Sequence, residues 1–151
     1  MRGLLRRLRA LLAPVARVRE ASDPVLGPLL LEPDDQLWWR ATRELGGRPV
    51  DFDIGGEAAP DPTLVAHAGE IVQGFPAFEA RIMAYLEGEA RLGTDLPGYA
   101  EEVRALRICA ISLWWPARPR DGVIHFLGPA PHRLWRCEYF RGAPRHLVFD
   151  S

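Results

Sequence analysis

The chain has 151 residues, 48% of them hydrophobic, which is enough for one compact domain that needs neither a metal nor a disulfide for stability. Its 19 basic residues, all arginine, face 20 acidic residues, and the formal net charge of -1 argues against a general nucleic-acid binder. No apolar run approaches the roughly 18 residues of a membrane span.

The charge is divided unevenly along the chain. Residues 1–20 hold six arginines and one acidic residue, whereas residues 21–151 hold 13 arginines and 19 acidic residues. We therefore divide the chain into a basic amphipathic arm, residues 1–22, and a single α+β domain, residues 23–151. The acidic body suits a basic protein partner, and we expect it to bind no nucleic acid.

The first 15 residues have the pattern of an amphipathic helix. Leucines recur at the spacing of one helical face, and Arg2, Arg6, Arg7 and Arg9 supply the positive charge. Such a helix could dock on the body or on a protein partner, or it could lie on an anionic membrane surface. A disordered extension or a wrongly assigned start is the third interpretation. We expect a cytoplasmic protein, soluble or peripheral to a membrane through this arm.

The chain after the arm has the pattern of three strands. Strands are expected at 25–31, 37–45 and 48–54. A turn signal at 33–35 and the Gly46-Gly47 pair, a strong hairpin signal, separate them. The third strand alternates cleanly between apolar residues and the aspartates Asp51 and Asp53. These strands predict an antiparallel meander.

The middle of the chain changes to a helical period, and the last third returns to strands. Helices are expected at 62–74 and 76–91, with a short helical turn at 98–104. Asp61 is placed to cap the first helix, with a proline at the first helical position. Four further strands are expected at 106–115, 123–127, 134–140 and 146–149. This order predicts an α+β fold, an antiparallel sheet of about six to seven strands with the helices packed on one face.

Few residues suggest catalysis. A hairpin turn at Arg141-Gly142 would place Cys137 directly opposite His146, and a cysteine–histidine pair can form an activated nucleophile. Against this, no third group orients the pair, and strand interiors are poor places for an exposed nucleophile. A small thiol- or histidine-dependent hydrolase built on Cys137, His146 or His125 is the second hypothesis, and packing is the simpler role for all three residues.

No motif predicts a metal or a cofactor. His67 and Glu70 share one helix face, but no further ligand accompanies them, so a satisfied helix pair is the simpler interpretation. The chain has no lysine, which excludes a P-loop, and it has no glycine-rich dinucleotide motif. We therefore expect neither a cofactor nor a metal site.

The five tryptophans carry the strongest functional signal. All lie on expected strands, and the Trp38-Trp39 and Trp114-Trp115 pairs must each send one ring to either face of the sheet. Rings on the second face need cover from a helix, from the arm or from a partner, and cover within the molecule is the default. We select Trp39, Trp115 and Trp135 as the candidate partner-binding residues.

Several short segments resemble a group of small bacterial proteins that share a domain of unknown function. They are Asp-Pro-Val-Leu-Gly at 23–27, the Trp38-Trp39 strand, Leu-Trp-Arg-Cys-Glu-Tyr at 134–139 and Leu-Val-Phe-Asp-Ser at 147–151. The resemblance covers about residues 23–151 and implies no particular activity. Some similar small α+β bacterial proteins serve as toxin-immunity or interaction modules, which is an analogy of fold alone. Our leading hypothesis is a non-enzymatic protein-interaction module, immunity-like or an adaptor.

Overall fold

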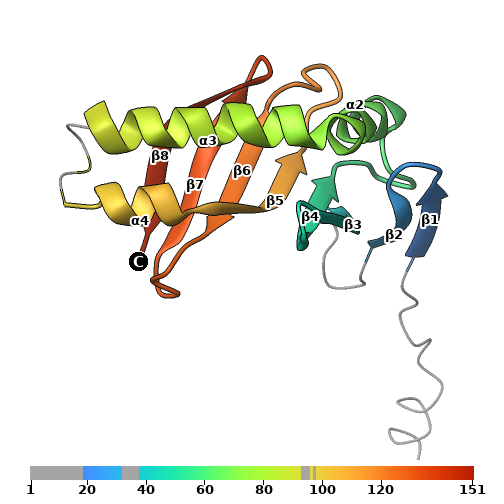
Figure 1. The fold of residues 1–151 in the computed structure, drawn as a ribbon. Helices are drawn as coiled ribbons and strands as arrows, with labels where there is room; N and C mark the ends of the chain where they lie inside the picture. Colours follow the sequence, from blue (N-terminus) through green and yellow to red (C-terminus); the bar gives the residue numbers. More distant parts are fainter. Residues whose placement is uncertain (1–18, 32–37, 93–95, 97) are drawn as a thin grey trace, which may run out of the picture.

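The computed structural model describes residues 19–31, 38–92, 96 and 98–151 (Figure 1). In chain order the elements are β1 (Arg19–Asp23), β2 (Gly27–Leu31), β3 (Trp39–Leu45), β4 (Arg48–Ile54), α2 (Pro62–Gln73), α3 (Phe75–Leu92), α4 (Ala100–Ala105), β5 (Arg107–Leu113), β6 (Gly122–Leu127), β7 (Leu134–Phe140) and β8 (Ala143–Asp150). The helix expected in the arm, with Arg2, Arg6, Arg7 and Arg9, and the turn expected at 33–35 lie outside the described residues.

The strands of the described residues form one sheet of eight, in which the spatial order follows the order along the chain. The α+β class is confirmed, and the expected count of six to seven strands is too low. The added strand is β1, which begins at Arg19, within the segment assigned to the arm, and pairs with β2. Neighbouring strands are antiparallel except β4 and β5, which run parallel because three helices lie between them in the chain.

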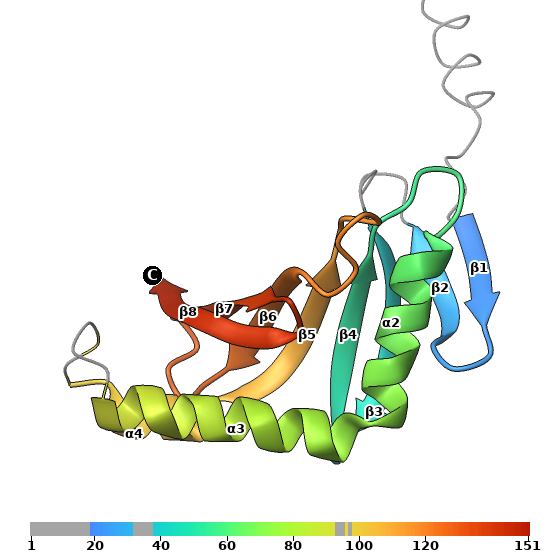
Figure 2. The ribbon, with the colours of Figure 1, turned by 90° about the horizontal axis from the view of Figure 1, so that it is seen from above.

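The helices pack on one side of this sheet. The Asp61 carboxylate accepts hydrogen bonds from the backbone N–H groups of Thr63 (2.9 Å) and Leu64 (3.2 Å), so the predicted N-cap of α2 is confirmed. Figure 1 shows α3 running across β5–β8 with α4 beside it, and Figure 2 shows α2 against the β1–β4 half. The Cβ position of Gly69 in α2 is 3.7 Å from Val25, so α2 packs closely on the turn between β1 and β2.

The core lies between these helices and one face of the sheet. The alternation expected for β4 is confirmed, because Val50, Phe52 and Ile54 are fully buried while Asp51 and Asp53 point to the opposite face. No helix of the described residues covers that opposite face, which we call the open face. It is formed by Leu30, Arg40, Thr42, Glu44, Asp51, Asp53, Ser112, His125, Arg136, Glu138, Arg145, Val148 and Asp150.

A hydrogen-bonded group attaches the short helix α4 to β7. The Glu102 carboxylate accepts hydrogen bonds at 2.9 Å from Nε and Nη2 of Arg133 and from the indole N–H of Trp135. The bond from Arg133 holds the pKa of Glu102 below its ordinary value. Paired charge-assisted bonds of this kind are among the stronger side-chain contacts, so α4 is fixed although it has only six residues.

Candidate functional site

The structure separates the three tryptophans selected from the sequence. Trp39 and Trp135 are 2% and 1% exposed, so both belong to the core and leave no ring surface for a partner. Their assignment to a partner-binding surface is corrected accordingly. Trp39 faces the helices because it pairs with Ile54, a residue of the buried face of β4. Trp115 is 41% exposed and is the one of the three that a partner could contact.

Trp115 belongs to a group of three rings, Trp38, Trp114 and Trp115, which we call the Trp cluster. The ring centroids of Trp38 and Trp114 are 5.1 Å apart, and those of Trp114 and Trp115 are 5.4 Å apart at 80°. Trp38 directly precedes β3 and Trp114 directly follows β5, so the two rings meet at the same end of strands that lie on either side of β4. The Arg118 guanidinium lies 4.6 Å from the centroid of the Trp115 ring.

The open face beside the Trp cluster carries polar side chains that are bonded to one another. Arg40 donates to Asp53 at 2.8 Å, and Thr42 donates to Asp51 at 2.6 Å. The Ser112 hydroxyl donates to the second oxygen of Asp53 at 3.3 Å. The two aspartates therefore connect β3, β4 and β5, and no group of three or more metal-ligating side chains forms within the described ranges.

The other half of the open face is charged in the same way. Arg136 of β7 pairs with Asp150 of β8, and Arg145 pairs with Glu138 at 2.7 Å. The Arg145 guanidinium also lies 3.6 Å from the centroid of the Phe140 ring. Exposed ion pairs of this kind add little to the free energy of unfolding. Their main effect is to set the pattern of charges that the open face presents to a partner.

The three residues considered for a thiol enzyme do not form a site together. The hairpin register holds as far as Glu138, but a β-bulge then places two residues, His146 and Leu147, opposite Cys137. Cys137 is buried on the helix side of β7, whereas His146 has a φ of 55° and is exposed. Burial raises the pKa of Cys137 to about 12, so the nucleophilic thiolate is scarce at neutral pH. His125 lies on the open face, away from Cys137.

We expect Cys137 to resist alkylation in the folded protein. Its thiol is buried and stays protonated through neutral pH, whereas Cys109 is only half-buried, although burial raises the pKa of Cys109 as well. Mass spectrometry after iodoacetamide treatment at about pH 8 should find Cys109 modified first and Cys137 modified only in denaturant. Modification of Cys137 in the folded chain at the rate of a free cysteine would restore the thiol-enzyme hypothesis.

His67 and Glu70 extend beyond a helix pair into a chain of three hydrogen-bonded side chains. The Nδ1 atom of His67 is 3.2 Å from a Glu70 carboxylate oxygen, and its Nε2 atom is 2.9 Å from the Tyr139 hydroxyl. Because a carboxylate only accepts, Nδ1 donates to Glu70 and the Tyr139 hydroxyl donates to Nε2. Burial lowers the pKa of His67, which favours the neutral ring. Sequence reasoning missed Tyr139 because it lies 72 residues away, on β7.

Comparison of the chain with protein-family models, with curated proteins and with solved structures finds no match. The resemblance to small bacterial proteins of unknown function stays an expectation drawn from short segments. Function therefore has to be argued from the geometry of this chain. Its two most informative features are the Trp cluster beside the open face and the Glu70–His67–Tyr139 chain.

Proposed function

We propose that the protein is a non-enzymatic protein-interaction module that binds a partner over the Trp cluster and the adjoining open face. The observation that carries the proposal is the exposure of Trp115 (41%) beside two further indoles and the guanidinium of Arg118. Tryptophan and arginine are among the side chains most enriched in interface hot spots, because tryptophan buries a large rigid ring and the arginine guanidinium both stacks on rings and donates several hydrogen bonds. A large exposed ring is costly in water, so cover by a partner stabilises it.

We infer that the partner is basic. Residues 21–151 hold 19 acidic residues against 13 arginines, and β3 and β4 bring Glu44, Asp51 and Asp53 to the open face against Arg40. Complementary charge speeds association and selects between partners. An immunity-like role, with a cationic toxin as the partner, is one form of this proposal and follows the resemblance noted above.

The two alternatives from the sequence have less support. A thiol- or histidine-dependent hydrolase would need a nucleophile beside a base, and Cys137 and His125 lie on opposite faces of the sheet. Membrane association depends on residues 1–15, which lie outside the described residues. Within the described ranges, no helix is long and apolar enough to cross a membrane.

Photo-crosslinking from the Trp115 position tests the proposal. A photoreactive phenylalanine analogue in place of Trp115 is expected to capture one defined protein in the source cells. The same analogue in place of Leu92, which is 78% exposed at the end of α3, is the matched control and is expected to capture none.

The affinity for the captured protein, once purified, gives a second test. Trp115→Ala is expected to raise Kd about 30-fold, the size of a hot-spot truncation, and Leu92→Ala to leave it unchanged. Capture of no protein from position 115, or an unchanged Kd for Trp115→Ala, would contradict the proposal.

A further inference from the structure

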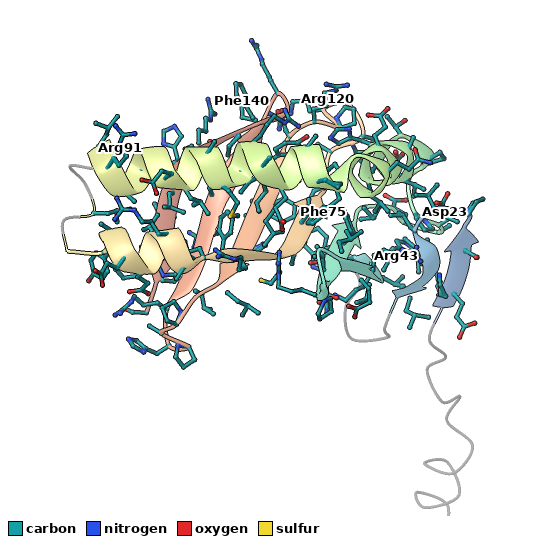
Figure 3. The ribbon with its side chains drawn as sticks, in the orientation of Figure 1. Asp23, Arg43, Phe75, Arg91, Arg120 and Phe140 are labelled. Carbon is teal, nitrogen blue, oxygen red and sulfur yellow. The ribbon has the colours of Figure 1, made fainter. Side chains whose placement is uncertain are left out.

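A cavity of about 250 Å³ lies where the junction of α2 and α3 meets the turn between β7 and β8. Its polar wall is formed by His67, Glu70, Arg81, Arg120 and Tyr139. Figure 3 shows Arg120 at the same edge of the molecule as Phe140, the residue before this turn, whereas Arg91 lies toward the far end of α3. The cavity therefore collects side chains from two helices, one strand and one loop.

The cavity wall has an excess of positive charge. The Arg81 guanidinium donates to the Gly142 carbonyl at 3.4 Å, and an Arg120 nitrogen is 3.9 Å from a Glu70 carboxylate oxygen. Both contacts are long, and each guanidinium has five N–H donors, so most of these donors are left for a ligand. Burial lowers the pKa of His67 and so favours its neutral form, which leaves the guanidinium groups of Arg81 and Arg120 facing the carboxylate of Glu70. A ligand with one negative charge would balance the wall.

The loop that carries Arg120 is held in place by the hairpin turn. The Gly142 N–H donates to the Arg120 carbonyl at 3.0 Å, and the Arg141 N–H donates to the Asp121 carboxylate at 2.9 Å. Asp121 is 6% exposed, and Arg141 has a φ of 49° that this bond stabilises. A wall that is ordered before binding costs less conformational entropy when a ligand arrives.

We propose that this cavity binds a small organic monocarboxylate, with the carboxylate between Arg81 and Arg120 and the apolar part against Ile71 and Phe78. Guanidinium groups match carboxylates through paired N–H···O bonds. A dianion such as phosphate would leave one negative charge unbalanced and has no apolar part to lie against Ile71 and Phe78. An apolar cavity of about 150 Å³ already holds benzene, so the present volume suffices for a single-ring acid. The inference does not rest on the proposed protein partner.

Binding of benzoate to the whole chain tests the proposal, with benzyl alcohol as the neutral probe and inorganic phosphate as the dianionic one. We expect benzoate to shift the amide resonances of Arg141 and Gly142 in ¹H–¹⁵N spectra, and to saturate in the millimolar range. Benzyl alcohol and phosphate are expected to bind at least about tenfold more weakly, because benzyl alcohol lacks the negative charge and phosphate lacks the apolar ring.

Variants then assign the effect to the two guanidinium groups. Arg81→Gln and Arg120→Gln are each expected to raise the Kd of benzoate about tenfold, the value of one charge-assisted hydrogen bond. Arg91→Gln, at the far end of α3, is the matched control and is expected to leave the Kd unchanged. Equal binding of benzyl alcohol, tighter binding of phosphate, no saturation with benzoate, or an unchanged Kd in both cavity variants would overturn the proposal. The probe needs no protein partner, so failure here leaves the interaction proposal standing.

Discussion

Gly122→Ala is expected to lower the free energy of unfolding by about 3 kcal/mol. Gly122 begins β6 and pairs with Leu113 near the middle of the sheet, and a Cβ atom there would lie 2.1 Å from the Ser112 carbonyl oxygen. That oxygen belongs to the backbone of a central strand, so it cannot move aside without separating β5 from β6. Close-packed interiors accommodate such a shift poorly.

Gly88→Ala is the matched control for this substitution. Apart from the backbone of its own helix, nothing lies within 4 Å of the Cβ position of Gly88, which is in the interior of α3. Alanine has the higher helix propensity, so this variant is expected to gain up to about 1 kcal/mol. Urea unfolding followed by tryptophan fluorescence and circular dichroism measures both variants. A Gly122→Ala protein as stable as the wild type would contradict the close approach of β6 to β5 at this residue.

Trp135→Ala is expected to cost about 3–5 kcal/mol of the free energy of unfolding. The indole is 1% exposed, and its ring centroid is 6.0 Å from that of Tyr99 and 4.8 Å from that of Phe149. Its truncation leaves a cavity under α4 and removes one of the donors to Glu102. Thermal and urea unfolding by circular dichroism give the size of the loss.

Trp115→Ala changes the same type of side chain in a different setting. Because Trp115 is 41% exposed, its truncation is expected to cost no more than about 1 kcal/mol. The two variants therefore separate a packing tryptophan from one available to a partner. Equal losses in Trp135→Ala and Trp115→Ala would show that the burial of these two rings is assigned wrongly.

Local signals in the sequence predicted much of the fold. The bounds of β4 are those expected from its alternation, and α2 begins at the expected cap, because capping and side-chain periodicity act over a few residues. β1 was missed because its residues, 19–23, are polar and mostly exposed at the edge of the sheet, so they show no apolar alternation. The sequence predicts an antiparallel sheet throughout, whereas β5 runs parallel to β4. No local pattern shows this direction, because it depends on where α2, α3 and α4 return the chain to the sheet.

The burial of Trp39 can be read from the sequence by a register count that the selection of partner-binding tryptophans left out. Counting back from the Gly46-Gly47 turn places Trp39 opposite Ile54, which the alternation of β4 assigns to the buried face. The same count would have removed Trp39 from the partner-binding residues. No such rule reaches the bulge opposite Cys137 or the contact of His67 with Tyr139, because both depend on how distant segments pack.

The parallel pairing of β4 and β5 divides the sheet into two halves that place different demands on folding. Within each half, strands that follow one another pair through short connections, so their contacts form with little loop-closure entropy. Across the boundary, Asp53 and Ser112 are bonded although they are 59 residues apart in the sequence. This pairing closes a long loop that contains α2, α3 and α4, so it costs more loop-closure entropy than the hairpins on either side, and it joins two local meanders into one sheet.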